Sequence, residues 1–193
     1  MDLDDTIAHR TTDLLGLADV HRWNVMKSTR SQSVAEHSFN VAVIVMELCQ
    51  RLGLESATAV RWSLLHDAPE TLTGDIDGKF KVLRPEMKEV LHGAEVALFP
   101  WYRDESEQVS EKAQAIVKLA DKVEATRWIA TFGIGGRANA VVAELRLRLI
   151  KFARQVEPLF LLEEGELPRL VLAVLDHSTS EEFSVQFRLR NER

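Results

Sequence analysis

The chain has 193 residues, a formal net charge of −6 and a hydrophobic share of 46%. These values are typical of one globular domain, and the acidic charge argues against broad nucleic-acid binding, which relies on dense Lys and Arg. No run of about eighteen apolar residues suggests a membrane-spanning helix, and the acidic N-terminus lacks the features of a secretory signal. The single Cys49 is expected to be buried, and the absence of a disulfide framework favours a cytoplasmic location.

Helical periodicity dominates the chain from its N-terminus onward. The stretch before Trp23 is predicted to be helical. Residues 33–53 carry apolar side chains three and four positions apart, as on one face of a helix. Ser33 and Glu36 form a capping box that predicts the start of this helix, and Gly53 predicts its end.

Residues 55–74 predict a second helix, which Pro69 is expected to kink or to end early. Further helices are predicted at residues 84–102, 110–133, 137–156 and 167–178. Residues 182–190 alternate in hydrophobicity like a strand. Since no repeat or linker interrupts this pattern, the sequence predicts one all-α domain.

A dense group of charged side chains occurs in "SLLHDAPETLTGD", residues 63–75. On a helix, His66 and Glu70 lie four positions apart and Asp67 and Glu70 three apart, so these side chains share a face. Crowded carboxylates repel one another unless a cation or a proton offsets their charge. An imidazole beside carboxylates suits Zn, Mn, Fe, Co or Ni better than calcium, so this segment indicates a transition-metal site.

Such a site needs ligands from other segments, and His37 and Asp121 are the candidates. His37 lies in the first turn of the capped helix, where it can point across a bundle. Asp121 lies on an otherwise apolar helix face, where burial without a partner is costly. With His66 and Asp67 they would supply two nitrogens and two carboxylates. Spacing alone leaves alternatives open, since His37 can be a hydrogen-bonded core residue and Asp121 can pair with a neighbouring lysine.

Separated motifs resemble one known family: "EHS" at residues 36–38, "HDAPETLTGD" beginning at His66, and the later "KLAD". A His, then His-Asp, then a distant Asp resembles the signature of the HD superfamily of metal-dependent phosphohydrolases. "HRWNVM", which contains Trp23, resembles the Arg-Trp element of bacterial 5′-deoxynucleotidases, and phage-type dATP triphosphohydrolases share these elements. The resemblance covers about residues 20–125, and in helical pattern most of the chain.

The resemblance implies a single HD-type helical bundle over residues 1–193. Its metal-site core would lie at about residues 20–125 and its C-terminal helices at 137–180. One divalent transition metal, Co, Mn or Zn, would be held by four ligands: His37, His66, Asp67 and Asp121. Glu70 and Asp75 would be the catalytic acid and base, in an order that the sequence does not assign. Without the resemblance, Glu70 could be a surface residue and Asp75 a helix cap.

Four further residues are candidates for binding the substrate. Arg22 offers a planar donor fork that suits phosphate, and Trp23 offers a flat wall that would crowd the sugar's 2′ position, as the resemblance implies. Lys81 lies in a cationic run directly after the catalytic loop. Lys118 lies three residues before Asp121 and shares its helix face. Each also has a simpler reading, as a core tryptophan or as a solvated surface cation.

These observations predict a metal-dependent phosphohydrolase of 2′-deoxynucleoside 5′-phosphates, in the first place a 5′-deoxynucleotidase that releases phosphate and deoxynucleoside. The first alternative is a dATP-type triphosphohydrolase that releases triphosphate, and the second is a non-catalytic nucleotide-binding sensor. The expected partner is a small deoxynucleotide, with no polymeric nucleic acid and no membrane. By resemblance we also expect a homo-oligomer, a dimer or higher, in the cytoplasm, or in the host cytoplasm for a phage protein.

Overall fold

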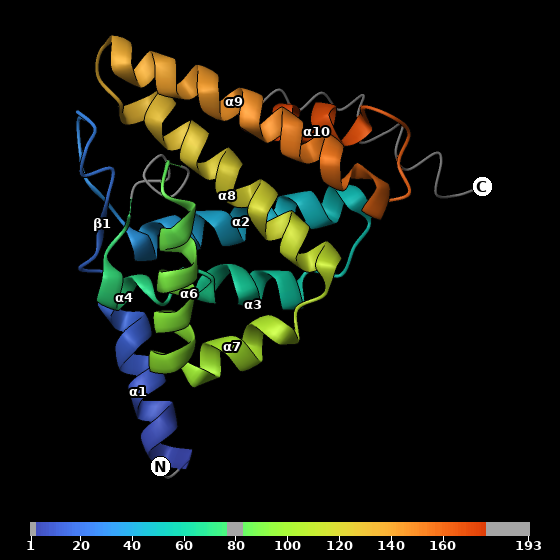
Figure 1. The fold of residues 1–193 in the computed structure, drawn as a ribbon. Helices are drawn as coiled ribbons and strands as arrows, with labels where there is room; N and C mark the ends of the chain where they lie inside the picture. The colour runs from blue at the N-terminus through green and yellow to red at the C-terminus, as the bar shows by residue number, and fades with distance from the viewer. Residues whose placement is uncertain (1–2, 77–82, 177–193) are drawn as a thin grey trace.

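Helices α2 and α8 pack against each other at the centre of the structure, a computed structural model that describes residues 3–76 and 83–176. Helix α3 packs on α2 and helix α9 on α8 (Figure 1). The bounds of these helices are Val34–Leu52 for α2, Ala57–Leu65 for α3, Glu111–Phe132 for α8 and Gly136–Val156 for α9. Their inward apolar side chains form the main core, which confirms the all-α fold and the predicted helices at 110–133 and 137–156.

The sequence signals at both ends of α2 are confirmed. The Ser33 hydroxyl accepts a hydrogen bond from the backbone N–H of Glu36 at 3.1 Å, as an N-cap does. The Glu36 carboxylate pairs with Arg30, so only half of the predicted capping box forms. Gly53 adopts a left-handed φ of 64° and closes the helix. The ring of His37, in the first turn of α2, is thereby fixed inside the bundle.

The second predicted helix ends early, as Pro69 led us to expect. Helix α3 stops at Leu65, a turn covers residues 66–69, and the short helix α4 spans Glu70–Thr73. Gly74 follows with a φ of 70°, which a residue with a Cβ adopts only under strain. The turn and this glycine redirect the chain, so the charged motif is presented by a loop rather than by one helix face.

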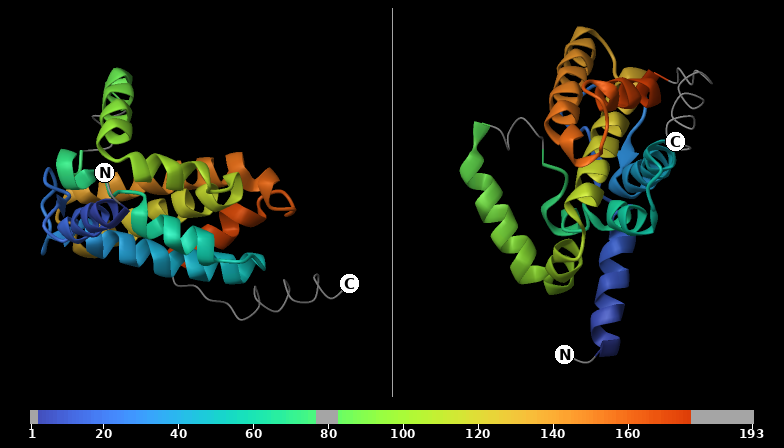
Figure 2. Two further views of the ribbon diagram at one scale, coloured as in Figure 1. Left: turned by 90° about the horizontal axis from the view of Figure 1, so that it is seen from below. Right: turned by 90° about the vertical axis from the view of Figure 1, so that its right-hand side faces the viewer.

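The prediction of one helix over residues 84–102 is wrong. The segment forms two helices, α6 at Pro85–Leu98 and α7 at Pro100–Glu107. Pro100 has no N–H to donate and disfavours helical geometry at Phe99, whose φ is −126° and ψ 71°. Helix α6 packs mainly on α7 and stands away from the bundle in both views of Figure 2.

Helix α1, Leu3–Gly16, confirms a helix before Trp23, but it is followed by a small hairpin that the sequence did not predict. Strand β1, His21–Arg22, pairs antiparallel with β2, Gln32–Ser33.

The 3₁₀ turn η1, Glu157–Leu159, leads to helix α10, Glu166–Asp176, which confirms most of the predicted helix at 167–178. Residues 177–178 and the predicted strand at 182–190 lie outside the described residues. No helix of the described residues has the length and the apolar character needed to cross a bilayer.

Candidate metal centre and adjoining pocket

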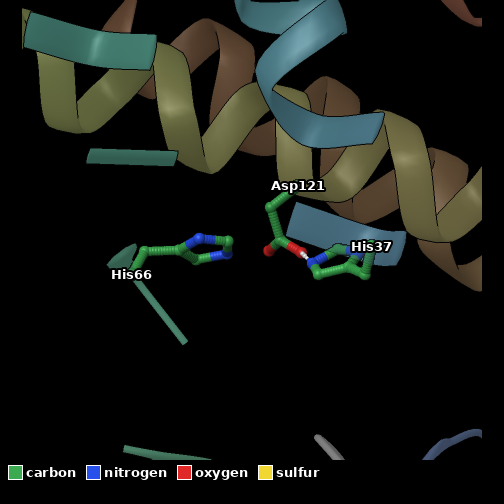
Figure 3. A group of neighbouring side chains, drawn as sticks. All are labelled: His37, His66 and Asp121. Carbon is green, nitrogen blue, oxygen red and sulfur yellow. Dashed lines mark ion pairs between the residues drawn. The ribbon is translucent and has the colours of Figure 1, made fainter. Parts of the chain in front are cut away.

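Two histidine rings from different elements point toward one carboxylate (Figure 3). His37 comes from α2, His66 from the turn after α3 and Asp121 from the middle of α8. One ligand atom from each lies within 4.8 Å of the other two. Neither histidine Nε2 has a hydrogen-bond partner among the described residues, although both atoms are buried. Two ring nitrogens and a carboxylate around a common point are a donor set that fits a divalent transition metal.

Asp67 stands beside the same point. Its Oδ2 lies 3.5 Å from the Nε2 of His37 and 3.3 Å from the Nε2 of His66, and it accepts a hydrogen bond from Arg22 at 3.2 Å. Burial raises the pKa of Asp67, but the two rings and Arg22 outweigh it, so its pKa is lowered. The pKa of Asp121 is lowered likewise, against burial, chiefly by its contact with His37. Both carboxylates therefore stay charged and attract a cation.

Both histidines are held through their other ring nitrogen. The Nδ1 of His66 donates to the backbone oxygen of Ser63 at 2.8 Å, and the Nδ1 of His37 donates to Glu124 Oε2 at 2.6 Å. A proton at Nδ1 leaves the Nε2 lone pair directed at the cluster, as in metal-ligating histidines.

A proton competes with a metal ion for the Nε2 atom of His37. Burial and Arg22 lower the pKa of His37, but its contacts with Asp121 and Glu124 outweigh them and raise it to about 9. A divalent cation would supply the same positive charge in place of that proton.

One face of α8 carries both a residue of the cluster and residues that contact its neighbours. Asp121, Glu124, Ala125 and Trp128 recur at helical spacing along it. The Asp121 carboxylate lies 3.3 Å from the Nε2 of His37, so it faces the cluster. This contact favours the role of a metal ligand over the alternative of a lysine partner.

A pocket of about 290 Å³ opens beside the cluster. Its lining includes Arg22, Trp23, Asp75 and Asp121, so the predicted phosphate-binding, sugar-binding, catalytic and metal-ligating residues meet in one cavity. Charged residues of α8 and α9 complete its polar wall: Lys122, Arg137, Glu144 and Arg148.

The pair Arg22-Trp23 is held tightly. The Arg22 side chain is largely buried, and among the described residues its Nε has no hydrogen-bond partner. Burial lowers the pKa of Arg22, but Asp67, Asp75 and other carboxylates raise it overall. Trp23 has a φ of 63° and stacks on Trp128 with ring centroids 5.6 Å apart and an interplanar angle of 3°.

The remaining predicted site residues are distributed unevenly. Glu70 begins α4, and its charge acts on Arg22. Lys118 is exposed and is not part of the pocket lining, whereas the neighbouring Lys122 is. Lys81 lies outside the described residues.

Sequence reasoning missed several residues that contact the site or its walls: Gln32, Tyr102, Lys122, Glu124, Trp128, Arg137, Glu144 and Arg148. Glu124 carried the same signal as Asp121, an acidic residue on a core-type helix face.

A helical bundle that gathers a histidine, a His-Asp pair and a distant aspartate beside a polar pocket defines an HD-type phosphohydrolase. Comparison with known proteins agrees. A family model described as "5'-deoxynucleotidase YfbR-like" matches residues 11–128. The chain therefore belongs to the YfbR-like family of HD-domain phosphohydrolases.

Individual relatives carry two names. A dATP triphosphohydrolase of Salmonella phage PMBT28 is 34% identical over 77% of this chain and 80% of its own. The 5'-deoxynucleotidase VV1113 of Vibrio vulnificus (strain YJ016) is 29% identical over 60% of this chain and 70% of its own. Among solved structures, the Cyanophage S-2L HD phosphohydrolase DatZ, bound to dA and one catalytic Zn²⁺ ion, shares the fold with a TM-score of 0.75. It is 24% identical, over 87% of this chain and 95% of its own.

Proposed function

We propose that this chain hydrolyses 2′-deoxynucleoside 5′-phosphates by cleaving the bond between the 5′ oxygen and the α-phosphorus. One observation carries the proposal. The Nε2 atoms of His37 and His66 face the carboxylates of Asp67 and Asp121, next to a pocket that Arg22 lines. Phosphoryl transfer needs positioning and positive charge more than covalent help from the protein, and this site offers both.

The four residues of the cluster would hold one divalent transition metal, Co, Mn or Zn. The catalytic Zn²⁺ of DatZ supports zinc among them. When bound, such an ion supplies Lewis-acid charge at a phosphoryl oxygen and lowers the pKa of a water molecule. A metal would also explain why this fold tolerates crowded, partly buried carboxylates.

The other residues of the site divide the remaining work. Arg22, tied to Asp67 through one nitrogen, lines the pocket and can offer its guanidinium charge and remaining N–H groups to a phosphoryl oxygen there. One of Glu70 and Asp75 orients and deprotonates the attacking water, and the other delivers a proton to the leaving 5′ oxygen. An O–P bond forms, the P–O5′ bond breaks, and the two water protons end on phosphate and on the 5′ oxygen. Lys118 and Lys81 stay predicted phosphate contacts, although Lys118 is not among the residues that line the pocket.

Trp23 supports deoxyribose as the sugar. Its ring lines the pocket and is backed by the buried ring of Trp128, so it forms a rigid wall. In the resembled deoxynucleotidases this tryptophan crowds the sugar's 2′ position. A ribonucleotide would then fit poorly.

A triphosphate is the second candidate substrate, and two observations favour it. Lys122, Arg137 and Arg148 line the pocket together with Arg22, and such a group of cations suits a longer polyphosphate. Two phage relatives named dATP triphosphohydrolase match 77% and 76% of this chain, against 60% for the Vibrio deoxynucleotidase. The cleaved bond and the leaving 5′ oxygen are the same, so the two activities differ only in the length of the phosphate chain that is released.

A product assay tests the proposal. The purified protein is offered every deoxynucleoside mono- and triphosphate with Mn²⁺, Co²⁺ or Zn²⁺, and anion-exchange chromatography separates phosphate from triphosphate. Asp67→Ala is the control and is expected to abolish turnover and to lower the bound metal. A wild-type protein that binds nucleotide without metal and without turnover would support the sensor instead.

We also infer a homo-oligomer, a dimer or higher. Helix α9 is the proposed contact helix, because Leu147 on it is 69% exposed. Light scattering of the purified protein measures this state. The single domain over residues 1–193 and the cytoplasmic location stay predictions from the sequence.

A further inference from the structure

A buried chain of hydrogen bonds connects the pocket wall to the metal cluster. The Trp23 indole N–H donates to Gln32 Oε1 at 3.0 Å, and Gln32 Nε2 donates to Glu124 Oε1 at 2.5 Å. The other Glu124 oxygen, Oε2, accepts from His37 Nδ1 at 2.6 Å. Gln32, Glu124 and His37 are all buried. Bulk water therefore cannot replace a lost partner in this chain.

The carboxylate of Glu124 sets the direction of every bond. An ionised carboxylate only accepts, so it requires N–H groups from His37, from Gln32 and from Asn40, whose Nδ2 lies 3.2 Å from Oε1. Gln32 must then turn its amide nitrogen toward Glu124 and its carbonyl oxygen toward Trp23. An indole N–H can only donate. No reversed arrangement of the chain keeps all of these groups satisfied.

The residues at both ends of this series of hydrogen bonds, His37 and Trp23, need such restraint. His37 requires a proton on Nδ1 if its Nε2 lone pair is to face a metal ion. Trp23 holds a φ of 63°, which is rare for a bulky residue and persists only where surrounding contacts offset the backbone strain. The bond to Gln32 and the stack on Trp128 are the contacts that fix it.

We propose that Glu124 and Gln32 are positioning residues, through which one buried carboxylate orients both the metal-ligating ring and the sugar-facing wall. Metal affinity depends on Glu124 but not on Gln32. Discrimination against a 2′-hydroxyl depends on both, because both hold Trp23. The statement about the sugar rests on the proposed function, whereas the statement about the metal rests on the cluster alone.

Glu124→Gln is the first test. An amide at this position brings a donor against Gln32 and Asn40 or against His37, and satisfying it by turning Gln32 around sets two donors face to face at Trp23. We expect Zn²⁺ affinity, measured by chelator competition without nucleotide, to fall about 10–100-fold. At saturating zinc, the affinity ratio of 2′-deoxyadenosine to adenosine is expected to fall about three- to tenfold, the size of one neutral hydrogen bond.

Gln32→Leu separates the two ends of the chain. It removes the bond to Trp23 but leaves Glu124 bound to His37 and Asn40. We expect the same fall in the nucleoside affinity ratio. The Zn²⁺ affinity should stay within about threefold of wild type, a smaller change than follows when the partner of a metal ligand is removed. In ¹⁵N NMR of the zinc-loaded protein, the Nδ1 proton signal of His37 should persist in Gln32→Leu and shift in Glu124→Gln.

Glu157→Gln is the matched control. Glu157 is also buried, but it accepts from the backbone N–H groups of Gly165 and Leu167. We expect it to lose thermal stability without a change in zinc affinity or in the nucleoside ratio.

Three outcomes overturn the inference, and each is distinct from failure of the proposed function. Glu124→Gln with zinc affinity within about threefold of wild type removes the link to the metal. An unchanged nucleoside ratio in Gln32→Leu removes the link to the wall, and this arm remains available should Glu124→Gln fail to fold. A zinc loss in Gln32→Leu equal to that in Glu124→Gln would show a general loosening of the core. Because these are binding measurements, they hold even if the protein hydrolyses neither nucleotide.

Discussion

Two buried glutamates lie in different regions of the molecule and use their carboxylates differently. Glu124, in the middle of α8, is 3% exposed, and Glu157, just after α9, is 8% exposed. Within the described part of the chain, Glu157 accepts from backbone N–H groups alone, from Gly165 at 2.9 Å and from Leu167 at 2.8 Å, at the start of α10. Glu124 accepts only from side chains among its described bonds, one of them a candidate metal ligand.

The type of donor separates a structural carboxylate from a positioning one. Backbone N–H groups at the start of a helix need an acceptor wherever they are buried, so a carboxylate there stabilises the fold. Side-chain donors, in contrast, are not needed to form a helix. A buried network of them is stable only when every member has a hydrogen-bond partner, and it then holds its members in place. The Glu157 region should therefore affect stability, and the Glu124 region the site.

The largest effect is expected from Asp121→Ala, one helical turn from Glu124. Loss of a metal ligand should exceed the loss of an outer partner, so turnover should fall at least about 100-fold. Added Zn²⁺ stabilises the wild type by an amount that grows with the logarithm of its concentration relative to its Kd, and the variant should lose this rise in thermal midpoint. Calorimetry with and without Zn²⁺ measures the rise. A variant that keeps it would exclude Asp121 from the ligand set.

Glu157→Ala is expected to change stability in place of function. It leaves two backbone N–H groups without their acceptor, at about 1–3 kcal/mol each, so the free energy of unfolding should fall by about 4 kcal/mol. The activity of each folded molecule should not change. Urea unfolding measures the free energy of unfolding. The turnover rate divided by the number of sites counted by Zn²⁺ titration measures the activity of each folded molecule. A loss of activity at unchanged stability would reverse our assignment of the two glutamates.

The free energy of unfolding of the metal-free protein should depend on pH through His37, which is bonded to Glu124, and not through Glu157. The folded-state pKa of His37 is raised from 6.5 to about 9, which corresponds to on the order of 3 kcal/mol. Since the pKa is raised, this stability is fully present below pH 6.5 and is lost as the pH rises toward 9. Zinc binding to the neutral ring strengthens over the same window, because fewer protons compete.

Urea unfolding across this window, with chelator and then with zinc, gives the two opposite slopes. His37→Gln should flatten both slopes, whereas Glu157→Gln should leave them as they are. Persistence of the metal-free slope in His37→Gln would assign it to another group.

The sequence predicted the parts of the molecule that depend on local rules. The ends of α2 follow from a capping serine and a terminal glycine, and the early end of α3 follows from Pro69. The candidate ligands His37 and Asp121 could be named because a family motif fixes their order, but their approach depends on how α2 packs on α8.

The rest of the site depends on contacts that no local pattern specifies. Gln32 lies 92 positions from Glu124 in the sequence, and nothing in its surroundings marks a glutamine as buried. The break at Pro100 is a local signal, but a proline near a helix start and one inside a helix look alike in an apolar pattern. Glu124 could have been found by the argument that singled out Asp121, three residues before it.

The smallest effect is expected from Tyr102→Phe, which extends the comparison to the turn that carries His66. The Tyr102 hydroxyl donates to the backbone oxygen of His66 at 2.7 Å, while its ring packs on Trp62. Phenylalanine keeps the ring and removes one hydrogen bond, about 1 kcal/mol, or about 2–4 °C in thermal midpoint. Zinc affinity should stay within about threefold, because the His66 ring keeps its own bond to Ser63.

Thermal unfolding and chelator competition on the same sample measure both changes. A zinc loss as large as that expected for Glu124→Gln would mean that the backbone of this turn, as well as the side chain behind the ring, holds a ligand in place. Contacts to backbone atoms would then also position the metal site, and the division between the two glutamates would apply only to the bundle core.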